Sequence, residues 1–278
     1  MIKNPYNPKT QIYTPLRMMG MSVNSFLTDN KKSFEGELGE NESDFEKYQL
    51  GGVFFYMQRL PKIIFEYNVP IEMGDEEVTQ KLFQAVMGWN DSYNKSSSQN
   101  PVESVTWYDC VSFCNKLSNL LGLEECYTML DVEMNSVHIT EATVKWDENK
   151  KGFRLPTEKE WELFARAGTK NKWSGTNEEI DLKDYAWYEV NSYEVNSGYT
   201  THPVGEKLPN GWGLYDMSGN VWEWCWDLYN PKQDTLTRVL RGGSYWYHAD
   251  FCRVAFRSGN VAGNRGGDRG FRLLRSFG

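Results

Sequence analysis

The pattern of apolar and polar positions along the chain predicts three helices. Residues 76–87 place apolar side chains at helical spacing, and Asp75 precedes them as a candidate N-cap. A second apolar stripe at helical spacing runs over residues 107–121. Thr157 and Glu160 have the spacing of a capping box, and the apolar side of a third helix follows them. We expect the three stripes to pack in one core.

Other segments have the features of strands and loops. Within residues 51–67, clusters of strand-forming residues lie on both sides of Pro61, which predicts two strands and a turn. Residues 127–151 predict a hairpin insertion that ends in the polar turn 147–150. Residues 169–200 are polar and weakly periodic, so we expect a long irregular segment there.

The segment 210–226, NGWGLYDMSGNVWEWCW, combines glycines with the bulkiest apolar residues. Glycine allows tight or left-handed backbone, and tryptophan buries a large area when the backbone permits close packing. Residues 221–226 alternate with the period of a strand, yet both faces are apolar apart from Glu223. This pattern predicts a strand that is buried on both sides.

Composition bounds the domain organisation. A chain of 278 residues with 40% hydrophobic content can bury one large core, and 24 glycines with 15% aromatic residues fit a loop-rich fold. The first residues have little periodicity. We therefore predict a partly irregular N-terminal extension at 1–48 and a single domain at 49–278.

Charge and hydropathy exclude some classes of partner. The net charge of −8 argues against binding of nucleic acid through a basic surface. No apolar run approaches the length of a membrane span. The first residues do not have the pattern of a signal peptide, which is consistent with a numbering that begins after a removed leader. The five cysteines are interpreted as small buried hydrophobic residues.

An ordered set of short motifs resembles the formylglycine-generating-enzyme (sulfatase-modifying factor) family. The resemblance implies an α+β fold that is a variant of the C-type lectin fold, loop-rich, with small antiparallel sheets and a few helices. Each motif alone is weak, but their order along the chain makes the set specific. The motifs occupy residues 77–80, 101–109, 152–158, 160–162, 203–205, 241–244 and 270–273.

The resemblance implies a structural calcium site in the turn 216–221. Calcium needs several converging oxygens, and the family supplies them here from the side chain that matches Asp216 and the carbonyls that match Met217, Gly219 and Val221. In the alternative interpretation, Asp216 only ties the turn to its own backbone.

The family's oxidase chemistry is not expected in this chain. Formylglycine-generating enzymes hold copper between two thiols that follow the Arg-Gly-Gly-Ser motif, and soft thiolates suit that metal. Tyr247 stands at the first thiol position, and the sequence around Cys252 matches a later, non-catalytic position better. We therefore predict no copper, no catalytic residues and no enzymatic activity, with a copper-dependent oxidoreductase as the main alternative.

The tail, residues 238–276, has an unusual composition. It contains eight arginines and no lysine, glutamate, glutamine or methionine, although the preceding chain uses all four. Framework-like residues alternate with positions that share neither polarity nor size, which a core strand would not tolerate. The framework-like residues are Arg241, Gly242, Gly243, Ser244, Cys252, Arg253, Ala255, Arg257, Arg265, Gly270, Phe271 and Arg272.

The tail resembles the variable region of proteins diversified by diversity-generating retroelements, including the treponemal variable proteins of this class. Those elements mutate adenines, mostly in AAY codons, which can become codons for Tyr, His, Asp, Phe, Ser, Gly and Val but never for Lys, Glu, Gln, Met or Trp. The tail obeys this rule if Trp246 belongs to the framework. The predicted ligand-binding positions, called the variable surface below, are Tyr245, Tyr247, His248, Asp250, Phe251, Phe256, Ser258, Gly259, Asn260, Val261, Gly263, Asn264, Gly266, Gly267 and Asp268.

The predicted function is therefore non-catalytic binding of a protein or glycan ligand by the variable surface, with arginines holding its loops. The resemblance implies display on a cell surface as a bacterial outer-membrane lipoprotein, with membrane contact only through a lipid anchor whose attachment cysteine is missing from this chain. A structural extracellular module with a fixed ligand is a third alternative. That alternative predicts that the positions of the variable surface are conserved between copies of the gene, whereas diversification predicts differences concentrated there.

Overall fold

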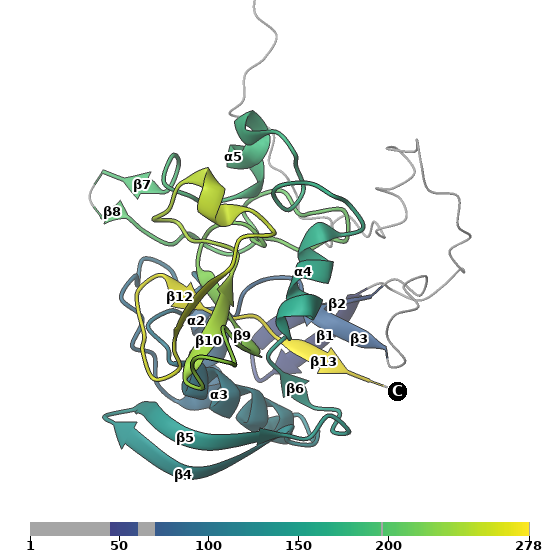
Figure 1. Cartoon of the computed structure of the whole chain (residues 1–278), viewed down its shortest axis with the longest axis vertical. Helices are drawn as coiled ribbons and strands as arrows, with labels where there is room; N and C mark the ends of the chain where they lie inside the picture. Colours follow the sequence, from purple (N-terminus) through teal and green to yellow (C-terminus); the bar gives the residue numbers. More distant parts are fainter. Residues whose placement is uncertain (1–44, 61–69, 196, 278) are drawn as a thin grey trace, which may run out of the picture.

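The computed structural model describes residues 45–60, 70–195 and 197–277. Two sheets form the centre of the fold (Figure 1). The first has the strand order β1 (Phe45–Leu50), β2 (Val53–Arg59), β3 (Ile71–Gly74), β13 (Leu274–Ser276) and β6 (Phe153–Arg154). The second has the order β11 (Ser258–Val261), β10 (Thr237–Arg241), β9 (Trp222–Leu228) and β12 (Arg269–Gly270), with β12 parallel to β9.

Two separate hairpins and several short helices surround these sheets (Figure 1). The hairpins are β4 (Tyr127–Asn135) with β5 (His138–Trp146), and β7 (Tyr193–Glu194) with β8 (Gly198–Tyr199). The α-helices are α2 (Gln80–Met87), α3 (Trp107–Leu120), α4 (Glu158–Arg166) and α5 (Leu182–Tyr185). Two 3-10 helices are η2 (Glu179–Asp181) and η3 (Ala249–Cys252).

Two of the three predicted helices have the predicted starts. Thr157 and Glu160 form the capping box of α4, and the α3 stripe is buried in the core. The first helix begins later than predicted, because the Thr79 side chain rather than Asp75 caps it by accepting from the Leu82 N–H at 3.1 Å. The residues before Thr79 do not join the helix, because the main chain of Val78 is hydrogen-bonded to Phe271 and Val102 instead.

The strand predictions are confirmed in part. The β4–β5 hairpin spans the predicted insertion, and a turn closed by the Lys150 N–H on the Asp147 carbonyl follows it. In the region 51–67, the first predicted strand is confirmed as β2, and it pairs through a turn at Gly51 and Gly52 with β1, which begins before the predicted region at Phe45. The second predicted strand, and residues 1–44 of the predicted extension, lie outside the described residues.

The predicted doubly buried segment forms the first part of β9, and the charge of its Glu223 is paired within the core. Glu223 and Arg272 are both fully buried and joined by two hydrogen bonds of 2.6 and 2.7 Å. Glu223 also accepts from the Trp161 indole at 2.6 Å. Arg272 donates further to the carbonyls of Gly74 and Tyr215, at 3.0 Å each. This pair connects β9 to the end of the chain.

We predict that Glu223→Gln lowers the free energy of unfolding by about 3–5 kcal/mol, because it leaves the buried Arg272 guanidinium without a countercharge. Denaturant titration of the variant and the parent chain measures the change. Glu124→Gln is the matched control, because Glu124 pairs with Lys150 at the exposed surface and its loss should leave the midpoint unchanged. Equal midpoints for both variants would contradict the prediction.

Candidate functional site

The tail folds as a continuous strip of strands, turns and the short helix η3 (Figure 1, yellow-green to yellow). Its predicted variable positions reach solvent, with one exception. Tyr245 is only 6% exposed, so this residue lies beneath the variable surface instead of on it. The other positions are partly or fully exposed, and His248, Asp250, Val261 and Asn264 are among the most open.

The framework-like positions divide into two groups. Most of them are buried, including Arg241, Ser244, Cys252 and Phe271. Arg253, Ala255, Arg257 and Arg265 are exposed instead. Exposed Arg257 and Arg265 serve the framework through ion pairs with residues outside the tail. Most of the framework-like positions predicted from the sequence are therefore buried, and Arg257 and Arg265 are instead held by ion pairs.

Arginines of the tail are held by carboxylates of the preceding chain, as the sequence predicted. Arg241 is buried and contacts Glu158 at 2.7 Å and Glu162 at 2.8 Å, both on helix α4. Arg257 forms a fork on the same Glu158, with two contacts of 2.8 Å. Such two-point contacts fix orientation as well as charge. The α4 carboxylates therefore hold β10 and the segment before β11.

A second charged network holds the loop before β12. Arg265 contacts Asp91 at 3.0 Å, and Asp91 also contacts the ring of His138 at 3.1 Å. The other ring nitrogen of His138 lies 2.7 Å from buried Asp109, the N3 residue of helix α3. Hydrogen bonds to the two carboxylates raise the pKa of His138 against the opposing effect of burial. The network joins the tail, the β4–β5 hairpin and α3.

Main-chain hydrogen bonds to the preceding chain also position the variable surface. Such bonds do not depend on which side chain occupies the position, so a side chain can change without breaking them. The carbonyls of three variable positions accept from N–H groups outside the tail. The pairs are Tyr247 with Glu189 at 3.1 Å, Gly266 with Ser104 at 3.0 Å, and Asp268 with Trp222 at 2.8 Å.

Three aromatic side chains of the variable surface form one cluster. The ring of Phe251 lies 5.2 Å from that of Tyr247 and 5.0 Å from that of Phe256. Trp222 of β9 packs beneath them, with centroids 5.6 Å from Tyr247 and 6.0 Å from Phe256. All three are partly exposed, so they offer rigid apolar contact area on a fixed floor.

The predicted variable positions differ in how much room they have for a larger side chain. A Cβ on Gly263 would clash with the backbone oxygen of Thr140 in the β4–β5 hairpin. A Cβ on Gly259 would lie 2.6 Å from the ring of Tyr229. Neighbouring Asn264 is exposed and has room for other side chains. Gly259 and Gly263 are therefore restricted by contacts, whereas Asn264 is not.

Two aromatic residues that border the variable surface were not among the predicted ligand-binding positions. Trp246 was assigned to the framework, yet its side chain is 57% exposed and lies against Tyr199 of β8. Tyr93, 82% exposed, adjoins Gly267. The signal that could have found them was the placement of large aromatic residues in otherwise polar loops.

A buried carboxylate supports one end of the surface. Glu103 is fully buried and accepts hydrogen bonds from the Asn94 N–H at 2.7 Å and the Ser104 hydroxyl at 2.6 Å. Burial raises the pKa of Glu103 to about 7 despite these bonds. The Asn94 amide in turn donates to the Gly267 carbonyl at 3.1 Å. Glu103 thus positions the loop at 266–268 through Asn94.

The turn 216–221 has features that suit a cation. Asp216 and Asn220 have left-handed backbone, with φ of 56° and 54°. One Asp216 oxygen accepts from the Gly205 N–H at 2.8 Å, and the other is buried without a hydrogen-bond partner among the described residues. Burial raises the pKa of Asp216 to about 7. A bound cation would compensate this buried carboxylate.

Two carbonyl oxygens of the turn lie close to Gly242. The Met217 and Val221 oxygens both lie within 4 Å of the position that a Cβ on Gly242 would take, at 3.7 and 3.8 Å. Gly219 has φ of 86° and donates to the Gly242 carbonyl at 2.9 Å. The turn 216–221 therefore contains a buried carboxylate oxygen that lacks a partner among the described residues and two neighbouring carbonyl oxygens, which are donor types that suit a small hard cation.

All five cysteines are buried and free, and Cys110, Cys114 and Cys126 share one core cluster. This confirms their interpretation as small buried residues. Cys252 packs with Trp173 and Tyr188, whereas Cys225 belongs to the cluster around Trp161. Burial raises the pKa of the Cys252 thiol to about 12, so it is protonated near neutral pH. Tyr247 carries a partly exposed phenol at the first thiol position.

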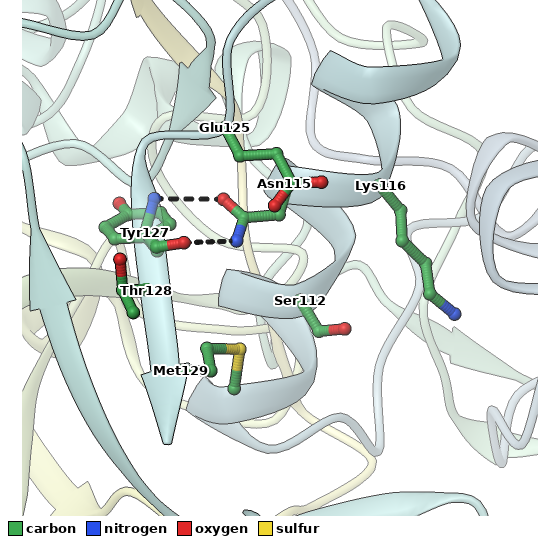
Figure 2. Close-up of a pocket in the computed structure, with 7 residues that line it drawn as sticks. All are labelled: Ser112, Asn115, Lys116, Glu125, Tyr127, Thr128 and Met129. Atoms are coloured by element: carbon green, nitrogen blue, oxygen red, sulfur yellow. Dashed lines mark hydrogen bonds between the residues drawn. The ribbon is translucent and has the colours of Figure 1, made fainter.

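A cavity of about 410 Å³ opens between α3 and β4 (Figure 2). Its lining includes Ser112, Lys116 and Thr128 but no residue of the tail. The Asn115 amide within it is occupied by the main chain of Tyr127, at 2.6 and 3.0 Å. The cavity therefore lies apart from the variable surface. None of the helices in the described ranges is long and apolar enough to cross a membrane.

Comparisons with known sequences identify relatives over most of the chain. The family described as sulfatase-modifying factor enzyme 1-like domain matches residues 45–277. The chaperone protein LppX of Paenibacillus barcinonensis is 34% identical over 226 residues, covering 73% of this chain and 79% of that protein. The formylglycine-generating enzyme of Streptomyces coelicolor is 37% identical over 145 residues, covering 44% of this chain and 46% of the enzyme. The match thus spans about half of that enzyme.

Comparison with solved structures finds a similar variable protein. Treponema denticola variable protein 1 has 40% sequence identity and a TM-score of 0.70, and the match covers 83% of this chain and 98% of that one. The similarity therefore includes nearly the whole of that structure.

We predict that two neighbouring substitutions in the tail differ in their effect on stability. Gly263→Ser should lower the free energy of unfolding by about 1–3 kcal/mol, because its Cβ forces the β4–β5 hairpin to move. Asn264→Ser should change it by less than about 0.5 kcal/mol, because the side chain is exposed. Thermal and denaturant unfolding of both variants measures the difference. Equal stability of the two variants would show that the hairpin contact does not restrict Gly263.

Proposed function

Because this chain belongs to the sulfatase-modifying factor enzyme 1-like domain family, we propose that it uses the family's scaffold to bind a ligand through a surface diversified by a retroelement. The predicted fold is confirmed, since the chain has the loop-rich C-type-lectin-like α+β fold of the formylglycine-generating type. The ligand contacts the variable surface, and the remainder of the domain holds that surface in place.

The observation that carries this proposal is that different residues of the tail hold it in place and face solvent. Side chains that fix the strip are mostly buried or paired with carboxylates outside it, whereas the predicted variable positions are partly or fully exposed, apart from Tyr245. Main-chain bonds hold the strip whichever side chains occupy those positions. A surface whose chemistry can change without altering the fold is what diversification requires.

The surface has the chemistry of an adaptable binding site. Tyr247, Phe251 and Phe256 supply contact area at low entropic cost, while exposed Asp250 and Asn264 supply polar contacts. This combination suits a protein or glycan ligand. Display on a cell surface through a lipid anchor would make it available to such ligands.

The enzymatic alternative has less support from the geometry. Copper-dependent oxidation of the family's type needs two adjacent thiolates, whereas Cys252 is buried beside Trp173 with a raised pKa and Tyr247 stands at the other position. To bind copper as a thiolate, Cys252 would have to lose its proton, and its buried surroundings disfavour the charged form. We therefore propose a binding protein without catalytic activity.

We also propose that calcium binds in the turn 216–221. Its ligands would be the Asp216 side chain and the carbonyls of Met217, Gly219 and Val221. The cation would neutralise the buried Asp216 carboxylate and stiffen the turn that lies against Gly242, at the start of the tail's first loop. Its role would be structural.

Calcium is predicted to raise the unfolding midpoint of the parent chain but not that of Asp216→Ala. At one hundred times the dissociation constant, binding to the folded state adds about 2.7 kcal/mol. Differential scanning calorimetry with calcium or with a chelator measures this effect. Asp147→Ala is the control, since Asp147 lies in an exposed turn after β5. An equal calcium effect in Asp216→Ala would rule out this site.

The diversification proposal predicts a near-copy of the DNA segment encoding residues 238–276, beside a reverse transcriptase gene. Sequencing of the DNA that flanks this gene tests it. We expect adenines in the copy at the codons of the variable surface, and unchanged codons for the buried framework. Absence of any such copy would leave a fixed-ligand or structural module as the better account.

A further inference from the structure

We propose that Tyr193, Tyr199 and Trp246 form a constant aromatic surface that binds a cationic side chain, lysine or arginine, of a protein ligand. This surface borders the variable surface and would be present in every diversified form of the protein. The inference rests on the proposed function, because it assigns a fixed part to the same binding face.

The three rings form an edge-to-face chain at the surface. Tyr193 and Tyr199, on the two strands of the β7–β8 hairpin, have ring centroids 5.4 Å apart. Tyr199 and Trp246 are 5.0 Å apart. Tyr193 is 61% exposed and Trp246 is 57% exposed, so large apolar rings face water. Exposed apolar area gathered in one place is a common mark of an interaction site.

The rings would remain constant while their neighbours vary. Tyr193 and Tyr199 lie outside the tail, and the tryptophan codon of Trp246 cannot arise from an AAY codon by mutation of its adenines. Trp246 nevertheless stands between Tyr245 and Tyr247, two positions of the predicted variable set. A fixed exposed tryptophan among variable positions is explained if each variant uses it for the same purpose.

The hairpin is held firmly against the tail. The Ser192 hydroxyl donates to the Tyr245 carbonyl at 2.6 Å, and the Glu189 N–H donates to the Tyr247 carbonyl at 3.1 Å. Figure 1 shows β7 and β8 beside the part of the tail that contains η3. A ligand on the variable surface could therefore contact the constant aromatic surface at the same time.

The charge around the rings favours a cation. Residues 178–207 contain seven carboxylates and two lysines. Glu189 and Glu194 are partly exposed carboxylates of this segment, and each lies within ion-pair distance of a histidine, His248 and His202 respectively. Lys207 extends over the Trp187 ring at 3.7 Å and donates to a backbone carbonyl.

These groups match the chemistry of a lysine or arginine side chain. The faces of aromatic rings attract cations, and arginine also stacks on them. A nearby carboxylate adds a charge-assisted hydrogen bond. An anionic ligand would meet the same carboxylates unfavourably. We therefore commit to a basic segment of a protein ligand and not to a glycan at this position.

The test uses octa-arginine as the probe and the parent chain labelled with 5-fluorotryptophan. The Trp246 fluorine resonance is the one that Trp246→Phe removes. We expect this resonance to shift saturably with octa-arginine and not with octa-glutamate. Affinity should fall at least tenfold in the double variant Tyr193→Ala, Tyr199→Ala and about fivefold in Glu194→Gln. Thermal midpoints verify that each variant is folded.

Two matched controls separate this surface from general effects. Phe54→Ala removes an exposed ring on β2, outside the binding face, and Glu178→Gln removes a carboxylate of the same acidic segment that is more distant in sequence from β7. Neither should change the affinity. No shift of the Trp246 resonance, or equal losses in the controls, would overturn the proposal. A shift that depends on protein concentration without peptide would identify a second copy as the occupant and would also overturn it.

The result is independent of the test for diversification. Octa-arginine binding uses one protein sequence and needs no tail variant. If it fails while the near-copy of the tail exists, only the constant aromatic surface is wrong. If it succeeds without a near-copy, the chain binds a basic partner but is not diversified.

Discussion

The buried ion pair between Glu223 and Arg272 is the interaction on which the arrangement of the tail depends. It places the end of the chain against the buried first half of β9, and the neighbouring residues complete both central sheets as β12 and β13. A charge pair this deep must be fully satisfied, and the Trp161 indole and two carbonyls complete it. The variable strip therefore starts and ends on fixed elements.

Between these fixed ends, ion pairs and main-chain hydrogen bonds hold the strip, and the side chains of the variable surface are not needed for this. Helix α4 presents Glu158 and Glu162 to Arg241 and Arg257, and Asp91 holds Arg265. An arginine fork on a carboxylate specifies position without filling space at the surface. The outer face is thereby left available for side chains of any size, except where Gly259 and Gly263 meet neighbouring segments.

Much of this account could be predicted from the sequence, because local signals dominate where it succeeded. Capping at Thr157 and the apolar faces around Trp224 specify their elements through short-range patterns. The late start of α2 could not be predicted, because Val78 pairs with segments distant in the sequence. Likewise, the phenol of buried Tyr245 hydrogen-bonds Asn94, and the ring of exposed Trp246 packs on Tyr199 of β8. No local pattern encodes either contact.

The central claim is that the buried residues of the tail stabilise the fold, whereas its exposed variable side chains set the chemistry of the surface. Its most direct test is a stability scan of every single substitution in residues 238–276, read out by resistance of the displayed domain to protease. The account predicts tolerance at the exposed variable positions and loss of stability at Arg241, Arg272 and the other buried framework residues. Equal sensitivity of both groups would contradict it, because side chains of the variable surface would then be needed to hold the fold.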